Sequence, residues 1–180
     1  MTRQPRPELE AECWAFALAI YARPGVAEAC LALQNEAGVD VMLLLTTTFA
    51  AVKHRLLLTL DEVRALDEAC RPWRVQIVWP LRTIRTGLKT GPQPAPSEAT
   101  EPFRSQVKAL ELAAEKLQNK LLVECLPLRP LEKETVRPEQ LRTVLGNVVS
   151  LFAKGRGTAT KANLPSSIDT IVEAAIPAAC

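Results

Sequence analysis

EPFRSQVKALELAAEKLQNKLLVEC, from Glu101 to Cys125, is the most strongly patterned stretch of this 180-residue chain. Its apolar residues alternate between spacings of four and three, which is the pattern of a helix that packs in a bundle. Helical periodicity also runs through most of the remaining chain, whereas strand-like alternation is nearly absent. We therefore expect an all-α, compact, bundle-like domain. The apolar stripe of this long helix consists of Phe103, Val107, Leu110, Ala114, Leu117 and Leu121.

N-terminal to this stretch, helix-breaking residues separate three shorter helices. Pro24 and Gly25 end a helix that begins near Glu8 and start a second one, since proline is tolerated at a helix N-terminus. Asp40 has the position of an N-cap for a third helix over residues 41–57. This third helix is apolar on most faces, so we expect it at the centre of the domain.

Two more helices are expected before the long helix. Thr59 and Glu62 have the spacing of a capping box, in which each side chain bonds the backbone N–H of the other. A fifth helix, PWRVQIVWPLRTIRTGLK, is expected to restart the chain at Pro72 and to run to Lys89. Pro80 inside it predicts a kink or a break, because proline removes one backbone hydrogen bond and clashes with the preceding turn.

We place the end of the compact part near Leu126. Pro127 and Pro130 interrupt the chain there, and no continuous apolar stripe follows. The expected organisation is therefore a helical domain over residues 8–126 and a looser, variable, partly helical C-terminal extension over residues 127–180.

Composition favours a cytoplasmic protein without a dedicated metal or cofactor. The 22 Lys and Arg residues nearly balance 20 Asp and Glu residues, which is too even for a general nucleic-acid coat. His54 is the single histidine, so sites built on two histidines are excluded. The five cysteines are an odd number without a Cys-x-x-Cys spacing, which argues against a disulfide framework or a structural zinc site. No apolar run is long enough for a membrane span.

Basic residues on the fifth helix form the most specific candidate for a binding surface. At 100° per residue they fall within one sector of about 80°, and two tryptophans add aromatic surface. Such a face suits phosphate, RNA or an acidic partner. It equally suits a solvated charged face that pairs with acidic residues of neighbouring helices. The candidate residues are Arg74, Arg82, Arg85 and Lys89, preceded by Arg71, together with Trp73 and Trp79.

A polar network is the second candidate. Glu111 and Glu115 lie one turn apart on the long helix, but the Glu-x-x-His and Asp-rich motifs of helical metalloenzymes are missing. The two carboxylates are placed to pair with the arginines of the fifth helix. Gln34 is expected to be a semi-buried polar group that hydrogen-bonds nearby backbone. Asp40, also a candidate member of the network, is expected to act as a helix cap. We name no catalytic residue and no metal ligand.

The segment from Glu12 to Leu45 carries four short motifs: Trp-x-Phe, Tyr-x-x-Pro-Gly-Val, Cys-Leu-x-Leu-Gln and Gly-x-Asp-Val. With these motifs the chain resembles an uncharacterised family of short helical proteobacterial proteins. The resemblance continues through the fifth and the long helix. It implies no activity, cofactor or catalytic residue. The motif residues are Trp14, Phe16, Tyr21, Pro24, Gly25, Val26, Cys30, Leu31, Leu33, Gln34, Gly38, Asp40 and Val41.

Three functions remain open at this point. The favoured one is a non-enzymatic cytoplasmic binding or adaptor protein that contacts a protein partner through helical surfaces. The second is an anion- or RNA-contacting protein that uses the arginine-rich face, which the small net charge of +2 does not favour. The third is a small-molecule enzyme whose site has no recognisable motif.

Overall fold

The computed structural model describes residues 6–127, 129, 134–153 and 164–176. These residues form helices and no strands, so the all-α prediction is confirmed. The elements are α1 (Pro7–Tyr21), α2 (Val26–Ala37), α3 (Val41–His54), α4 (Leu60–Trp73), the π-helical segment η1 (Arg74–Val78), α5 (Trp79–Gly87), α6 (Glu101–Cys125), α7 (Pro138–Ala153) and α8 (Leu164–Ala175).

Helix α3 is the central helix, as its apolar composition predicts. Every side chain from Met42 to Val52 is buried, and α1, α6 and α7 pack around it. Asp40 is its N-cap, since its Oδ1 accepts hydrogen bonds from the backbone N–H groups of Met42 at 2.9 Å and Leu43 at 3.2 Å. The helix ends earlier than expected because Arg55 adopts a left-handed φ of 51°.

Helices α7 and α8 belong to the same hydrophobic core as the preceding helices. Helix α7 packs on α3 and α4, and α8 packs along α2. Leu141, Leu145 and Ile171 are fully buried within this core. The core therefore extends past Leu126, where the sequence analysis placed its end, because two short amphipathic helices cover faces that the N-terminal helices leave open. Residues 128, 130–133, 154–163 and 177–180 of the expected extension lie outside the described residues.

The chain runs from α4 into α5 without the expected restart. Pro72 lies inside α4, and the backbone continues through η1 into α5 with helical dihedral angles. The N–H of Trp79 donates to the carbonyl oxygen of Arg74, five residues earlier. This wider turn stands directly before Pro80, whose ring would otherwise clash with the turn that precedes it. Pro80 thus changes the type of helix rather than ending it.

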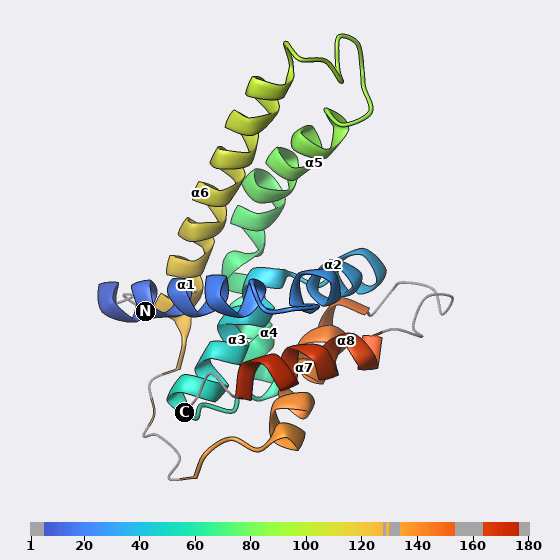
Figure 1. Cartoon of the computed structure of the whole chain (residues 1–180). Helices are drawn as coiled ribbons and strands as arrows, with labels where there is room; N and C mark the ends of the chain where they lie inside the picture. The colour runs from blue at the N-terminus through green and yellow to red at the C-terminus, as the bar shows by residue number, and fades with distance from the viewer. Residues whose placement is uncertain (1–5, 128, 130–133, 154–163, 177–180) are drawn as a thin grey trace.

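Helices α5 and α6 form an antiparallel hairpin that projects from the other helices (Figure 1). The inward face of α6 differs from the expected apolar stripe. Val107 and Ala114 are buried as expected, but Phe103, Leu110 and Leu117 are 53%, 58% and 54% exposed. Glu111, Gln118 and Asn119 are buried in their place. The stripe prediction was wrong for these positions because groups on other elements bind the buried polar side chains: Arg82 and Arg85 bind Glu111, Asp40 binds Gln118, and the backbone oxygen of Glu10 accepts from the Asn119 amide.

No single helix among the described residues combines the length and the apolar character needed to cross a membrane. Helices α1 and α2 pass that test only as a pair, which is bent by 98°.

Candidate functional site

A buried ion-pair cluster fixes the base of the hairpin. Arg74 Nη1 lies 2.8 Å from Asp40 Oδ2 and 2.7 Å from Asp67 Oδ1, and all three side chains are at most 5% exposed. Gln118 of α6 donates a hydrogen bond to Asp40 Oδ2. Burial disfavours the charged guanidinium, but the two carboxylates outweigh this effect and raise the pKa of Arg74 above its usual value. The cluster thus ties η1 to the start of α3, to α4 and to α6.

A second, half-buried network joins the hairpin to α2. Arg82 donates from Nε to Glu111 Oε1 at 2.9 Å, from Nη2 to Glu115 Oε1 at 2.6 Å and from Nη1 to Gln34 Oε1 at 2.6 Å. Arg85 donates to both oxygens of Glu111. All these polar groups come from three different helices. One guanidinium therefore links α2 to both helices of the hairpin.

The two carboxylates of this network shift in opposite directions. Burial acts to raise the pKa of Glu111, but its bonds to Arg85 and Arg82 outweigh burial and lower the pKa below its usual value. Burial dominates at Glu115, and its pKa is raised although Arg82 acts against the shift. The arginines thus stabilise the charged form of Glu111 more strongly than that of Glu115.

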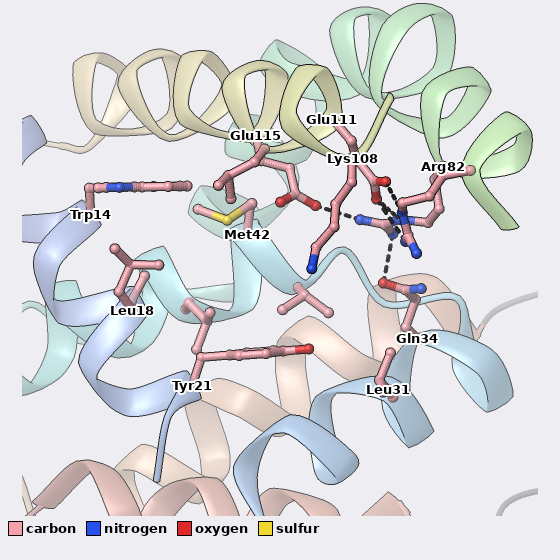
Figure 2. A pocket seen from close by; sticks show the side chains of 15 residues that line it. Trp14, Leu18, Tyr21, Leu31, Gln34, Met42, Arg82, Lys108, Glu111 and Glu115 are labelled. Carbon is pink, nitrogen blue, oxygen red and sulfur yellow. Dashed lines mark hydrogen bonds and ion pairs between the residues drawn. The ribbon is translucent and has the colours of Figure 1, made fainter. Parts of the chain in front are cut away.

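A pocket of about 300 Å³ opens between α1, α2, the start of α3 and the hairpin (Figure 2). Its size lies at the lower end of the range for ligand sites. Most of its wall is apolar, and the Arg82 network forms one edge. The apolar lining consists of Trp14, Ala17, Leu18, Tyr21, Leu31, Val41, Met42, Leu45 and Leu112; the polar lining consists of Gln34, Arg82, Arg85, Lys108, Glu111 and Glu115.

Two polar groups of the pocket are available to a ligand. Figure 2 shows Lys108 of α6 and Tyr21 of α1 reaching into the pocket from different sides. Within the described part of the chain, neither side chain has a hydrogen-bond or ion-pair partner. Burial, followed by nearby acidic groups, raises the pKa of Tyr21, so its hydroxyl stays a neutral donor. Glu111 and Glu115 balance Arg82 and Arg85, which leaves Lys108 as the excess positive charge of the pocket.

The residues of the predicted basic face do not form one continuous surface in the structure. Arg74 is buried in the cluster with Asp40, whereas Arg82 and Arg85 join Gln34, Glu111 and Glu115 at the pocket. The Trp73 indole N–H donates to the backbone oxygen of Ala114 at 3.0 Å. The Trp79 ring is 41% exposed and lies beside Arg74, and Lys89 is exposed just beyond the C-terminus of α5.

Sequence reasoning missed Lys108, Leu112 and Leu18 of the pocket. One signal was present: motif residues of α1, α2 and the start of α3 converge on this pocket, namely Trp14, Tyr21, Leu31, Gln34 and Val41. The motifs lie on three different helices, so a common site for them was visible only after the helices were placed in space.

Comparison with known proteins identifies a family. Residues 12–122 match the family described as "Protein of unknown function (DUF2390)". This range contains every residue that lines the pocket. No curated protein and no solved structure matches the chain.

Proposed function

This chain belongs to the family described as protein of unknown function (DUF2390), and we propose that it is a non-enzymatic cytoplasmic adaptor that binds a segment of a protein partner. The pocket between α1, α2 and the hairpin is the binding site. One observation carries the proposal: an apolar wall stands beside a polar edge whose single uncompensated charge is Lys108. Cys13, Cys30 and Cys70 are buried free thiols, which suits a reducing compartment such as the cytoplasm.

The groups around the pocket favour binding over chemistry. Arg82 and Arg85 are held by carboxylates and an amide, so they form a fixed edge. Cys30 on neighbouring α2 is fully buried, and burial raises its pKa to about 12, which keeps the thiol protonated and unreactive. A fixed polar edge and an apolar wall orient a ligand without supplying a nucleophile.

The shape of the site favours a peptide segment as the occupant. Leu18, Leu31 and Leu112 at the pocket are each about half exposed, so apolar contact surface reaches the solvent-facing rim. An amphipathic helix that lays its apolar side into a groove uses such a surface. Lys108 provides charge complementarity to an acidic residue of that helix. We therefore propose a partner segment with a large apolar side chain next to Asp or Glu.

The alternative use of the arginine-rich face for RNA has less support. Arg74 is 3% exposed, and Arg82 and Arg85 already bind carboxylates. Phosphate binding at these arginines would first have to break ion pairs in a half-buried setting.

A display library of random helical peptides, panned against the full chain, tests the proposal. We expect the selected peptides to share a large apolar residue beside an acidic one. A selected peptide is then measured as a monovalent ligand. Its affinity for the Leu112→Arg variant should be lower by about tenfold or more, because the substitution places a charge at the apolar wall. Val75→Arg is the control, because Val75 is also an exposed apolar residue, at 41%, but does not line the pocket.

Charge exchange provides the sharper measurement. Lys108→Glu should weaken binding of the acidic peptide, and a peptide with Lys in place of its acidic residue should recover affinity for that variant. Failure to select any peptide, or selected peptides that bind Leu112→Arg as tightly as the natural chain, would refute the pocket as the binding site.

A further inference from the structure

A second apolar surface lies on the flank of the hairpin that faces away from the pocket. We call it the hairpin outer face and define it by Ile77, Ile84, Phe103, Leu110 and Leu117. These side chains are between 37% and 58% exposed. None of them lines the pocket.

The pairing of the two helices shows that these residues share one flank. Arg85 and Glu111 face each other across the hairpin. Ile84 and Leu110 each directly precede one of them, and a step of one residue rotates the side chain by about 100°. In an antiparallel pair this rotation carries both predecessors to the same side. Leu112, which directly follows Glu111, points to the opposite side and lines the pocket.

Helix α6 therefore has two seams. The first contains Val107, Glu111, Ala114 and Gln118, which are buried against neighbouring elements. The second alternates by three and four through Phe103, Gln106, Leu110, Ala113 and Leu117, and all five residues are exposed. Alternating spacings of three and four are the pattern of a helix that packs against another helix. A helix with two such seams fits a bundle with helices on both sides of it.

The second seam carries no charged residue. The charged residues of α6 between Glu101 and Leu117 lie elsewhere on the helix: Glu101, Arg104, Lys108, Glu111, Glu115 and Lys116. Two identical uncharged surfaces meet without repulsion, whereas a partner selected by charge would need an ionic group here. The composition of the seam thus favours a second copy of this chain.

We propose that a second copy docks on the hairpin outer face, so that two hairpins form an antiparallel four-helix bundle about a twofold axis. The five defining side chains expose on the order of 500 Å² of surface, at roughly 200 Å² for a fully exposed large apolar residue. With Gln106, Ala113 and the partly exposed Leu81 and Leu88, the face approaches the roughly 800 Å² that each partner contributes to a standard interface. The hairpin projects from the other helices, which leaves this face open for packing (Figure 1).

Sedimentation equilibrium of the full chain over a wide concentration range tests the proposal. We expect a particle of twice the 19.7 kDa chain mass. Leu110→Arg should weaken dimerisation by about a hundredfold or more, because the dimer would bury an unpaired charge in an apolar seam. Leu112→Arg is the matched control, since it makes the same change two residues away on the pocket flank and should leave the dimer intact.

Circular dichroism of each variant separates dissociation from unfolding, and Leu110 is exposed enough that its replacement should not affect the fold. The double variant Phe103→Gln with Leu117→Gln removes two apolar contacts without adding charge and should also be monomeric. A natural chain that stays monomeric at every concentration overturns the proposal. So does a dimer that survives Leu110→Arg, or one that Leu112→Arg dissociates.

Discussion

Arg74 and Asp40 form a buried ion pair, 2.8 Å from Nη1 to Oδ2, between residues that are 34 positions apart in the chain. Asp40 Oδ1 caps α3, while Oδ2 of the same carboxylate accepts from Arg74 and Gln118. One side chain therefore starts the central helix and anchors the base of the hairpin.

Replacement of Arg74 should strongly destabilise the protein. Arg74→Gln leaves the buried Asp40 without its cation and leaves Asp67 paired only with Arg71, whose side chain is 55% exposed. Breaking a buried pair in this way costs about 3–5 kcal/mol of unfolding free energy. Arg64→Gln is the control, because it breaks an exposed pair with Asp61 and should cost under about 1 kcal/mol. Urea unfolding measures both. Equal, small losses for the two variants would show that the buried cluster does not stabilise the fold.

Ionisation of Glu111 should make the free energy of unfolding decrease as the pH becomes acidic. Because its folded pKa is lowered, ionised Glu111 stabilises the fold above the usual carboxyl pKa of 4.5, and this contribution is lost as the pH falls through the lower folded value. Glu111→Gln should therefore destabilise the protein at neutral pH and flatten the loss of stability below pH 4.5. Unfolding free energies measured across this range test the slope.

Glu115 is the matched comparison, since it belongs to the same network but its pKa is raised. Its ionisation opposes folding at neutral pH, so Glu115→Gln should cost less stability there than Glu111→Gln. The reverse order of the two variants would contradict the stronger stabilisation of charged Glu111 by the arginines.

Removal of everything after Leu126 should unfold the protein. Leu141, Leu145, Val148 and Ile171 are fully buried, and each contributes about 1.5–3 kcal/mol by burial. Their combined loss is comparable to the about 5–15 kcal/mol by which whole domains are stable. A truncated chain that still melts cooperatively would instead support the division at Leu126 expected from the sequence.

Three cysteines should resist a bulky thiol reagent in the native protein. Burial is the main cause that raises the pKa of Cys13, Cys30 and Cys70 to about 12 in each case. Mass spectrometry after timed exposure at neutral pH should find Cys125, which is partly exposed, modified faster than these three. Denaturant should abolish the difference. Rapid native labelling of Cys30 would reopen an enzymatic role for the pocket.

Most of the helices could be predicted from the sequence, because caps and helix breakers act through residues that are close together in the chain. The Asp40 cap and the Thr59–Glu62 capping box are present as predicted. The orientation of α6 was not predictable in this way. Glu111 and Gln118 resemble surface residues until Arg85 and Asp40, which are distant in sequence, lie opposite them. Pairing over such distances is decided by tertiary packing, which periodicity does not report.

The candidate site shows the same limit. Spacing predicted that Glu111 and Glu115 pair with Arg74 and Arg82. The structure shows these pairs for Arg82, and Arg85 also pairs with Glu111. Arg74 pairs with Asp40 and Asp67 instead. The pocket itself depends on how α1 and α2 lie against the hairpin. Lys108 and Leu112 gain their significance only from that placement, since each is an ordinary residue of an exposed helix side in the sequence.

The pocket and the hairpin outer face lie on opposite flanks of the same two helices. Self-association through the outer face would therefore leave both pockets open and turned outward. Such an assembly is bivalent. A partner that carries two binding segments on a flexible tether would meet the second pocket at an effective concentration in the millimolar range for short tethers, and avidity could exceed single-site affinity by about 10²–10⁴. Weak individual pockets would then suffice for selective capture of tandem or clustered partners.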